Sequence, residues 1–243
     1  MSFNKRADFF ITGTDTGVGK TLVACALLQA LGEAGYTAVG MKPIASGAEQ
    51  RNGHWQNDDV ANLAASSHAD LVTELAQHKR INWLNPYCFP EAVAPHLAAQ
   101  KQGKAIRLPP ILECFKHLKT HADAVVVEGV GGFMVPINEQ ETTADLARYL
   151  QIPLVLVVGL RLGCINHALL TVEAIKAQGL HLAAWVANSV DTDMALQAEN
   201  IASLQQRIAA PLLGVIPKLE QAQAHNAAAY LALEKLGEKT RQV

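Results

Sequence analysis

A glycine-rich segment near the start of the chain combines the residue types that bind phosphate. Residues 13–21 read Gly-Thr-Asp-Thr-Gly-Val-Gly-Lys-Thr, between the apolar run 9–11 and the apolar residues 22–28. The order strand, loop, helix is the context of a phosphate-binding loop (P-loop), whose amides and helix N-terminus attract anions. Five residues separate Gly13 from Gly19 instead of the usual four. Gly-Lys-Thr at this junction nevertheless predicts nucleotide binding.

The residues that close the loop have specific expected roles. Lys20 can reach the β- and γ-phosphates, and the hydroxyl of Thr21 can ligate Mg²⁺. The other expected nucleotide contacts come from the preceding residues of the same loop, which are Gly13, Asp15, Thr16, Gly17, Val18 and Gly19.

An acid suited to Mg²⁺ ends a later apolar run. Residues 123–128, Asp-Ala-Val-Val-Val-Glu, predict a strand, and glycines follow at positions 129, 131 and 132. Asp123 begins this strand, so at ~3.3 Å per residue it would lie ~17 Å from the edge where Glu128 ends it. We therefore assign Glu128 to Mg²⁺, directly or through water, and Asp123 to solvent.

A second lysine follows another predicted strand. Lys42 opens the sequence Lys-Pro-Ile-Ala-Ser-Gly, in which Pro43 fixes the direction of the turn and Ser46-Gly47 suits a loop that approaches a ligand. Its position opposite the P-loop favours an anion-binding role. Downstream, Asn57-Asp58-Asp59 opens a helix. One aspartate is expected to cap this helix, and the other to complete the Mg²⁺ shell.

These residues must be positioned by a sheet whose strands are apolar on both faces, as in parallel sheets covered by helices. In such sheets ligands bind beyond the carboxyl ends of the strands, where the candidates above lie. The predicted fold class is α/β, P-loop NTPase-like, with a mostly parallel central sheet and helices on both faces. The predicted strands are Phe9–Ile11, Thr37–Met41, Asp123–Glu128, Leu154–Val158, Leu182–Asn188 and Leu212–Ile216.

Helices are expected between the strands. The interval 42–122 shows no clear strand and is interpreted as an insertion beside the sheet, so that residues 1–243 form a single domain. Residues 220–243 are expected to form a loosely packed helix and tail. The predicted helices are one from the P-loop to about Ala34, Asp58–Ser66, Pro109–His121, Ala144–Leu150, Asn166–Ala177, Ala195–Ile208 and a C-terminal helix Ala222–Leu236.

Composition excludes several classes of function. The net charge near −2 gives no electrostatic reason to bind nucleic acid or an anionic membrane. No apolar run approaches the ~20 residues that span a bilayer, and the polar N-terminus lacks the core of a signal peptide. The four cysteines have no paired spacing, which argues against a zinc site or a disulfide framework. We expect a cytoplasmic protein with neither membrane nor nucleic-acid partner.

Taken together, the motifs resemble the dethiobiotin synthetases, ATP-dependent enzymes of biotin synthesis. They occur in family order between residues 9 and 219, and the long P-loop spacing is the family's own. The segments that carry the resemblance are residues 13–21, 42–47, 57–59, 85–87, 95–96, 127–132, 163–168, 185–188 and 211–217.

The resemblance implies a cyclo-ligase that uses ATP and Mg²⁺ to join CO₂ (or bicarbonate) to 7,8-diaminopelargonate, giving dethiobiotin, ADP and phosphate. It implies Mg²⁺ ligation by Thr21, Asp59 and Glu128, and adenine recognition near Asn188 and Pro217. It also implies a homodimer with the substrate near the interface. The residues implied for catalysis are Lys20, Lys42, Thr16 and Ser46, and those for substrate binding are Thr16, Lys42, Ser46, Gly129, Gly131, Gly163, Cys164, Ile165 and Asn166.

Two other functions share this fold class. A chromosome-partitioning ATPase would be a switch, but those proteins carry a second lysine four residues before the last loop glycine, where this chain has Asp15. A cobyrinate-type amidating synthetase needs an ammonia-producing domain after the ATP domain, and the sequence ends at Val243 without room for one. A nucleotide-binding module without catalysis is the remaining alternative.

Overall fold

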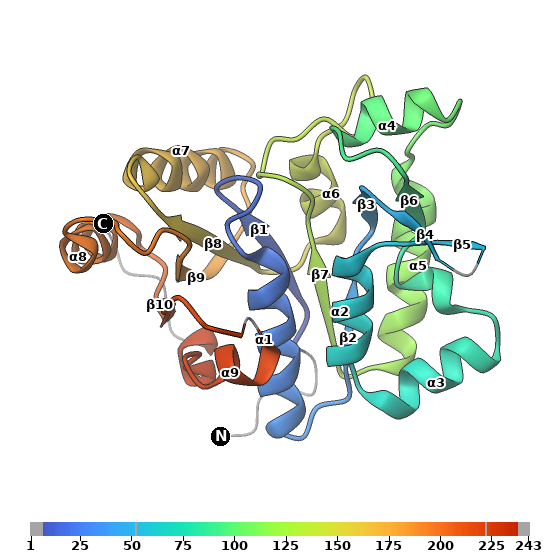
Figure 1. The fold of residues 1–243 in the computed structure, drawn as a ribbon, viewed down its shortest axis with the longest axis horizontal. Helices are drawn as coiled ribbons and strands as arrows, with labels where there is room; N and C mark the ends of the chain where they lie inside the picture. The colour runs from blue at the N-terminus through green and yellow to red at the C-terminus, as the bar shows by residue number, and fades with distance from the viewer. Residues whose placement is uncertain (1–6, 52, 222, 238–243) are drawn as a thin grey trace.

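A computed structural model describes residues 7–51, 53–221 and 223–237 of the chain. Its centre is a six-stranded sheet in the order β10-β9-β8-β1-β7-β2, which crosses Figure 1 from left to right. All five neighbouring pairs are parallel. The strands are β1 (Phe9–Gly13), β2 (Ala38–Met41), β7 (Ala124–Glu128), β8 (Leu154–Leu160), β9 (Leu182–Ser189) and β10 (Leu212–Ile216). The six strands predicted from apolar runs are confirmed.

The register of the central strands brings the functional edge together. Ile11 of β1 aligns with Glu128 at the end of β7 and with Val155 of β8. Glu128 therefore lies beside the strand that leads into the P-loop. Asp123 lies before β7, at the opposite edge, as predicted. It is half-buried and accepts a hydrogen bond from the backbone N–H of Thr37 at 3.0 Å, so the prediction of a solvated Asp123 was wrong.

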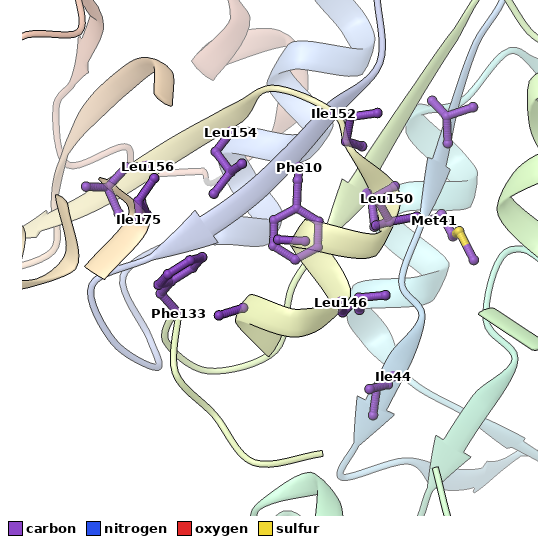
Figure 2. Packing of buried hydrophobic residues seen from close by; sticks show 14 of the residues in the cluster. Phe10, Met41, Ile44, Phe133, Leu146, Leu150, Ile152, Leu154, Leu156 and Ile175 are labelled. Carbon is purple, nitrogen blue, oxygen red and sulfur yellow. The ribbon is translucent and has the colours of Figure 1, made fainter. Parts of the chain in front are cut away.

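Two apolar clusters cover the two faces of the sheet. Because side chains alternate along a strand, Phe9 and Ile11 join one cluster and Phe10 the other. Figure 2 shows Phe10 packed among residues of β8 and α6. The helices are α1 (Lys20–Glu33), α2 (Asp58–Ser66), α3 (Ala69–Gln77), α4 (Pro95–Lys101), α5 (Leu108–His121), α6 (Thr143–Leu150), α7 (Cys164–Ala177), α8 (Gln197–Arg207) and α9 (Ala224–Ala228), with 3₁₀ turns η1 (Ile81–Trp83) and η2 (Leu233–Gly237).

The segment 42–122 lies beside the β2 edge of the sheet (Figure 1). It contains four short strands, so the expectation of no strand there was wrong. Strand β3 (Ile44–Ser46) pairs with the distant β6 (Tyr87–Phe89), and the hairpin β4 (Glu49–Arg51) and β5 (His54–Gln56) follows β3. Each of these strands is only three residues long, and β4 is exposed, so none forms an apolar run long enough to predict a strand. Helices α3 and α4 were also not predicted.

The C-terminal region departs from the single helix predicted over Ala222–Leu236. The helix α9 covers only Ala224–Ala228, and a separate 3₁₀ turn follows at Leu233. Between them the backbone packs against β10: the N–H of Ala232 donates to the carbonyl of Leu213 at 2.9 Å. Close packing on Gly214, where a Cβ would lie 2.0 Å from the carbonyl of Tyr230, fixes this break. Residue 222 and residues 238–243 of the predicted tail lie outside the described part.

The four cysteines are free; Cys25 and Cys164 are buried, and Cys88 and Cys114 are half-buried. Within the described ranges, none of the helices has the length and apolarity needed to cross a bilayer.

Candidate active site

The P-loop connects β1 to α1 through a backbone that requires glycine. Gly17 and Gly19 adopt positive φ angles of 73° and 91°. At Gly19 a Cβ would also lie only 2.1 Å from Nδ2 of Asn188. That amide donates to the carbonyl of Val18 at 2.9 Å, so Asn188 at the end of β9 holds the loop from the side. The loop shape is therefore fixed both by its glycines and by a neighbouring strand.

Lys20 begins α1 and points back into its own loop. Its Nζ donates to the carbonyl of Asp15 at 2.9 Å, and the residue is only 7% exposed. Burial, together with the nearby charge of Lys42, lowers the pKa of Lys20 to about 8. An anion bound in the loop would favour the charged form of this lysine.

A cluster of charged residues lies next to the loop. The Nζ of Lys42 contacts Oε1 of Glu128 at 2.6 Å and Oδ2 of Asp59 at 3.0 Å. It also donates to the carbonyl of Gly129 at 3.2 Å. The hydroxyl of Thr21 lies 2.8 Å from Oδ1 of Asp59 and 3.0 Å from Oε1 of Glu128. Four places in the sequence, at residues 21, 42, 59 and 128–129, thus meet at one point.

The surroundings of the cluster determine its charge. Burial by itself would lower the pKa of Lys42, but the carboxylates of Glu128 and Asp59 raise it above the ordinary value. Burial by itself would raise the pKa of Asp59, but the charge of Lys42 and the Thr21 hydroxyl hold this pKa below its usual range. Burial raises the pKa of Glu128, and Lys42 acts in the opposite direction. Lys42 and Asp59 are therefore charged at neutral pH.

The oxygen atoms of this cluster suit a hard divalent cation. Thr21, Asp59 and Glu128 present a hydroxyl and two carboxylates, the ligand types that Mg²⁺ accepts. Oε2 of Glu128 is buried and has no hydrogen-bond partner among the described residues. A buried carboxylate oxygen without a partner is costly, so this donor set fits a bound cation.

These residues line a cleft of about 820 Å³. The cleft also contains Ser46, whose buried hydroxyl finds no hydrogen-bond partner in the described part of the chain and is available to a ligand. On the other side, a Cβ on Gly131 would lie 3.7 Å from the hydroxyl of Thr16. The predicted residues that line the cleft are Asp15, Thr16, Gly17, Gly19, Lys20, Thr21, Lys42, Ser46, Asp59, Glu128 and Gly131.

Other predicted residues lie around the cleft without lining it. Gly13, Val18 and Gly129 belong to its supporting backbone, and Asn188 packs behind the loop. Pro217 is exposed just after β10.

Residues 163–166 form the start of α7, apart from the lining of the main cleft. Gly163 is the N-cap residue, and Ile165 and Asn166 lie in the first turn. The side chain of Cys164 is packed in the core at 2% exposure, so only its backbone could reach a ligand.

Several residues of the site were given no role in the sequence analysis. Residues 92–95, at the start of α4, line the cleft opposite the P-loop, together with Val130, Gly132 and Val135. Pro95-His96 is one of the segments that carry the family resemblance, but the sequence predicts no role for it. Arg161 forms an ion pair with Asp15 across the loop, at 2.5 Å. Arginine after a strand gives no signal of such a partner in the sequence.

Comparisons with known proteins agree with this geometry. Residues 7–226 match a family described as an AAA domain. A protein of Aromatoleum aromaticum named ATP-dependent dethiobiotin synthetase BioD is 51% identical over 93% of this chain and 96% of its own length. The chain belongs to the dethiobiotin synthetase family. Equally named relatives from Janthinobacterium and Cellvibrio japonicus are 48% and 47% identical, over 91% and 94% of the chain and 92% and 96% of their own lengths.

Solved structures similar to this member of the family share its fold. A ParA family ATPase from Chlorobium tepidum has a TM-score of 0.54 at 16% identity and covers 96% of this chain and 93% of its own. The MinC:MinD cell division complex of Aquifex aeolicus gives 0.55 at 16% identity, covering 97% and 98%. At such identities the likeness concerns the P-loop α/β fold alone, which is confirmed. The family relation favours the resemblance to the dethiobiotin synthetases over the partitioning-ATPase alternative.

Proposed function

We propose that this protein joins 7,8-diaminopelargonate (7,8-diaminononanoate) and CO₂ in an ATP-dependent ring closure that yields dethiobiotin, ADP and phosphate. The observation that carries the proposal is the convergence of Lys20 and Lys42, both buried, in one cleft beside a P-loop. A cyclisation through a carbamate needs positive charge at a carboxylate and at a phosphoryl group simultaneously. The name shared by the relatives supports the same reaction.

The first step forms a carbamate. One amine nitrogen of the substrate attacks the carbon of CO₂, a C–N bond forms, and the nitrogen loses a proton to solvent. The product carries a negative charge, which the protonated Lys42 can stabilise because neighbouring carboxylates keep this lysine charged. The hydroxyls of Ser46 and Thr16 are positioned in the cleft to donate hydrogen bonds to the carbamate or to the diamine.

The second step activates the carbamate. One carbamate oxygen attacks the γ-phosphorus of ATP, and the bond to the leaving ADP oxygen breaks. Such transfers depend on positioning and charge stabilisation more than on covalent help from the protein. The amides of the P-loop and Lys20 would hold the phosphates in line. The backbone at Gly131, which lines the cleft, would let the substrate approach, while Gly129 lies behind the lining and its carbonyl accepts from Lys42.

The third step closes the ring. The second amine attacks the carbonyl carbon of the carbamic-phosphoric anhydride, and the C–O bond to phosphate breaks. The attacking nitrogen loses its proton, which leaves a five-membered urea and inorganic phosphate. Lys20 and Lys42 face the departing phosphate from the cleft, so the same charges serve both transfers.

Thr21, Asp59 and Glu128 would hold Mg²⁺ in this scheme. When bound, the ion supplies charge neutralisation to the phosphates of ATP. The residues themselves orient each other: the Thr21 hydroxyl and Lys42 fix both carboxylates before any ligand arrives.

The adenine and the substrate tail are proposed to bind at the rims of the cleft. Nδ2 of Asn188 donates to the carbonyl of Val18 in the P-loop. Its Oδ1 is proposed to accept a hydrogen bond from the adenine amino group, near Pro217. The carboxylate tail is proposed to bind at residues 163–166 near the interface of a homodimer. Leu162 and Leu170, beside this helix start, are 96% and 63% exposed, as an apolar interface requires.

The proposal is tested by incubating the purified protein with diaminopelargonate, bicarbonate and Mg-ATP and identifying the product by mass spectrometry. Dethiobiotin should form only when all three are present. ATP hydrolysis without dethiobiotin would refute ring closure and favour a switch ATPase of the partitioning type. Light scattering of the same sample should give twice the chain mass, and a monomeric mass would refute the proposed dimer.

A further inference from the structure

The two sides of the charged cluster are anchored to different parts of the molecule. Strand β3, which ends at Ser46, is held by pairing with β6. Helix α2, which carries Asp59, is held against α1 and β2, where Leu63 packs over Gly40 and the hydroxyl of Ser67 accepts from the N–H of Gly40 at 2.9 Å. Lys42 and Thr21 contact the Asp59 carboxylate directly. The backbone turn that carries Asp59 needs its own connection to the strand end at Ser46.

One side chain makes this connection directly. Nδ2 of Asn57 donates to the carbonyl of Ser46 at 3.1 Å. Oδ1 of the same residue accepts from the backbone N–H groups of Asp59 at 3.1 Å and Val60 at 3.3 Å, as the N-cap of α2. A single amide thus links the strand end at Ser46 to the helix turn that presents Asp59.

The chain between these points is a weaker connection. Residues 49–51 of the β4–β5 hairpin are exposed. The side-chain link from this hairpin to α2, between Arg51 and Asp58, joins groups that are 44% and 72% exposed. Exposed ion pairs contribute little, because water and salt screen them. Of these two links, the half-buried Asn57 is therefore better placed to fix the distance between the backbone of Ser46 and the first turn of α2.

We propose that Asn57 is a positioning residue, which sets the place of the Asp59 carboxylate relative to Ser46 and thereby the affinity of the site for its divalent cation. The inference rests on the proposed function in so far as Asp59 is taken as a Mg²⁺ ligand. The side chain of Asn57 bonds to backbone groups of Ser46, Asp59 and Val60. It does not bond to the oxygen atoms proposed to ligate the cation or to either lysine, so it would act by positioning the backbone that carries Asp59. Residues that orient metal ligands in this way commonly change metal affinity about 10- to 100-fold.

The two functions of Asn57 can be separated by substitution. Asn57→Ser retains an oxygen that can cap α2 but lacks a donor that reaches the Ser46 carbonyl. Asn57→Ala removes both. Arg51→Ala is the matched control, since it removes the exposed link between the hairpin and α2.

The experiment measures Mn²⁺ binding to the ADP complex of each variant by the EPR signal of the free ion, which needs no turnover. Asn57→Ser should keep a thermal midpoint near that of the unaltered protein but weaken Mn²⁺ binding about 10-fold, as much as Asn57→Ala does. Arg51→Ala should leave the affinity within about twofold. Unchanged Mn²⁺ affinity in Asn57→Ser would overturn the proposal, as would an equal loss in Arg51→Ala.

The same variants distinguish this inference from the proposed function. At saturating Mg²⁺, Asn57→Ser should form dethiobiotin with an unchanged KM for the diamine, and only the Mg²⁺ requirement should rise. If the unaltered protein makes no dethiobiotin, ring closure fails while the Mn²⁺ comparison still decides the role of Asn57. If the ADP complex of the unaltered protein binds no Mn²⁺, the role of Asn57 is refuted.

Discussion

Residues 13–21 and residues 42–59 each bring a lysine to the cleft, but they are held in different ways. The first segment has a contact within itself, from Lys20 to the carbonyl of Asp15 five residues away, and is supported from outside by Asn188 and Arg161. The second is fixed by distant residues. The N–H of Lys42 donates to the carbonyl of Leu84 at 2.7 Å, and the Asn85 amide donates to the Lys42 carbonyl at 2.6 Å. The comparison teaches that a nucleotide site can be local in sequence while the site that uses the nucleotide is assembled by the fold.

The largest effect that would separate residues 42–59 from residues 13–21 is expected from Lys42→Met. Loss of the charge that stabilises the carbamate should lower the ring-closure rate at least ~100-fold, while nucleotide affinity changes only a few-fold because the first segment is intact. Leaving Glu128 buried without Lys42 should also lower the free energy of unfolding by about 3–5 kcal/mol. Steady-state turnover, ADP titration and denaturant unfolding measure the three effects.

The exposed Lys104→Met serves as the control for charge alone and should behave like the unaltered protein. A Lys42→Met protein with an undiminished rate would remove Lys42 from the reaction. Equal losses of turnover and of nucleotide affinity would show that the two segments are not separable.

A smaller effect on turnover is expected from Glu128→Gln. Glu128 contacts Thr21 of the first segment and Lys42 of the second. The amide keeps the shape of the side chain but loses the charge, so the Mg²⁺ concentration for half-maximal turnover should rise about 10- to 100-fold. The exposed Glu173→Gln is its control and should leave that concentration unchanged. If Glu128→Gln leaves the Mg²⁺ dependence of turnover unaltered, Glu128 is not a Mg²⁺ ligand.

The smallest expected effect concerns residues 13–21 and is the pH dependence of nucleotide binding. The pKa of Lys20 is lowered to about 8 in the free protein, and its protonated form binds phosphate. Nucleotide affinity should therefore be constant well below that pH and weaken above it, by up to about tenfold per pH unit, since binding must then take up a proton. Calorimetry in two buffers of different ionisation enthalpy detects this proton uptake. Affinity that stays level from about pH 7 to about pH 9.5 would contradict the lowered pKa.

The same contrast explains how far the sequence could be interpreted. The six strands of the central sheet were predictable because a buried parallel strand is apolar on both faces, and the P-loop because its signal is contiguous. The β3–β6 pair joins Ile44 to Tyr87, and no local pattern announces such a contact. The predicted C-terminal helix failed because packing against Gly214 outweighed an alanine-rich, helix-favouring sequence.

Within the site, residue type and position pointed to Lys20 at the end of the P-loop, Lys42 directly after β2 and Glu128 as the last residue of β7. Of the two aspartates that open α2, Asp59 contacts Lys42 and Thr21, whereas Asp58 pairs with the exposed Arg51. The predicted cap was assigned to one of these aspartates, but Asn57 makes it. The pairing of Asp15 with Arg161 depends on two loops meeting at the sheet edge, which only the fold reveals.

The most direct test of the central claim follows oxygen from CO₂ into the products. The reaction is run with ¹⁸O-labelled CO₂, fast enough to limit exchange with water, and both products are weighed by mass spectrometry. If the carbamate is phosphorylated and its C–O bond then breaks, one labelled oxygen appears in phosphate and one in the urea of dethiobiotin. Phosphate free of label, beside labelled dethiobiotin, would contradict a cleft that works by activating a carbamate.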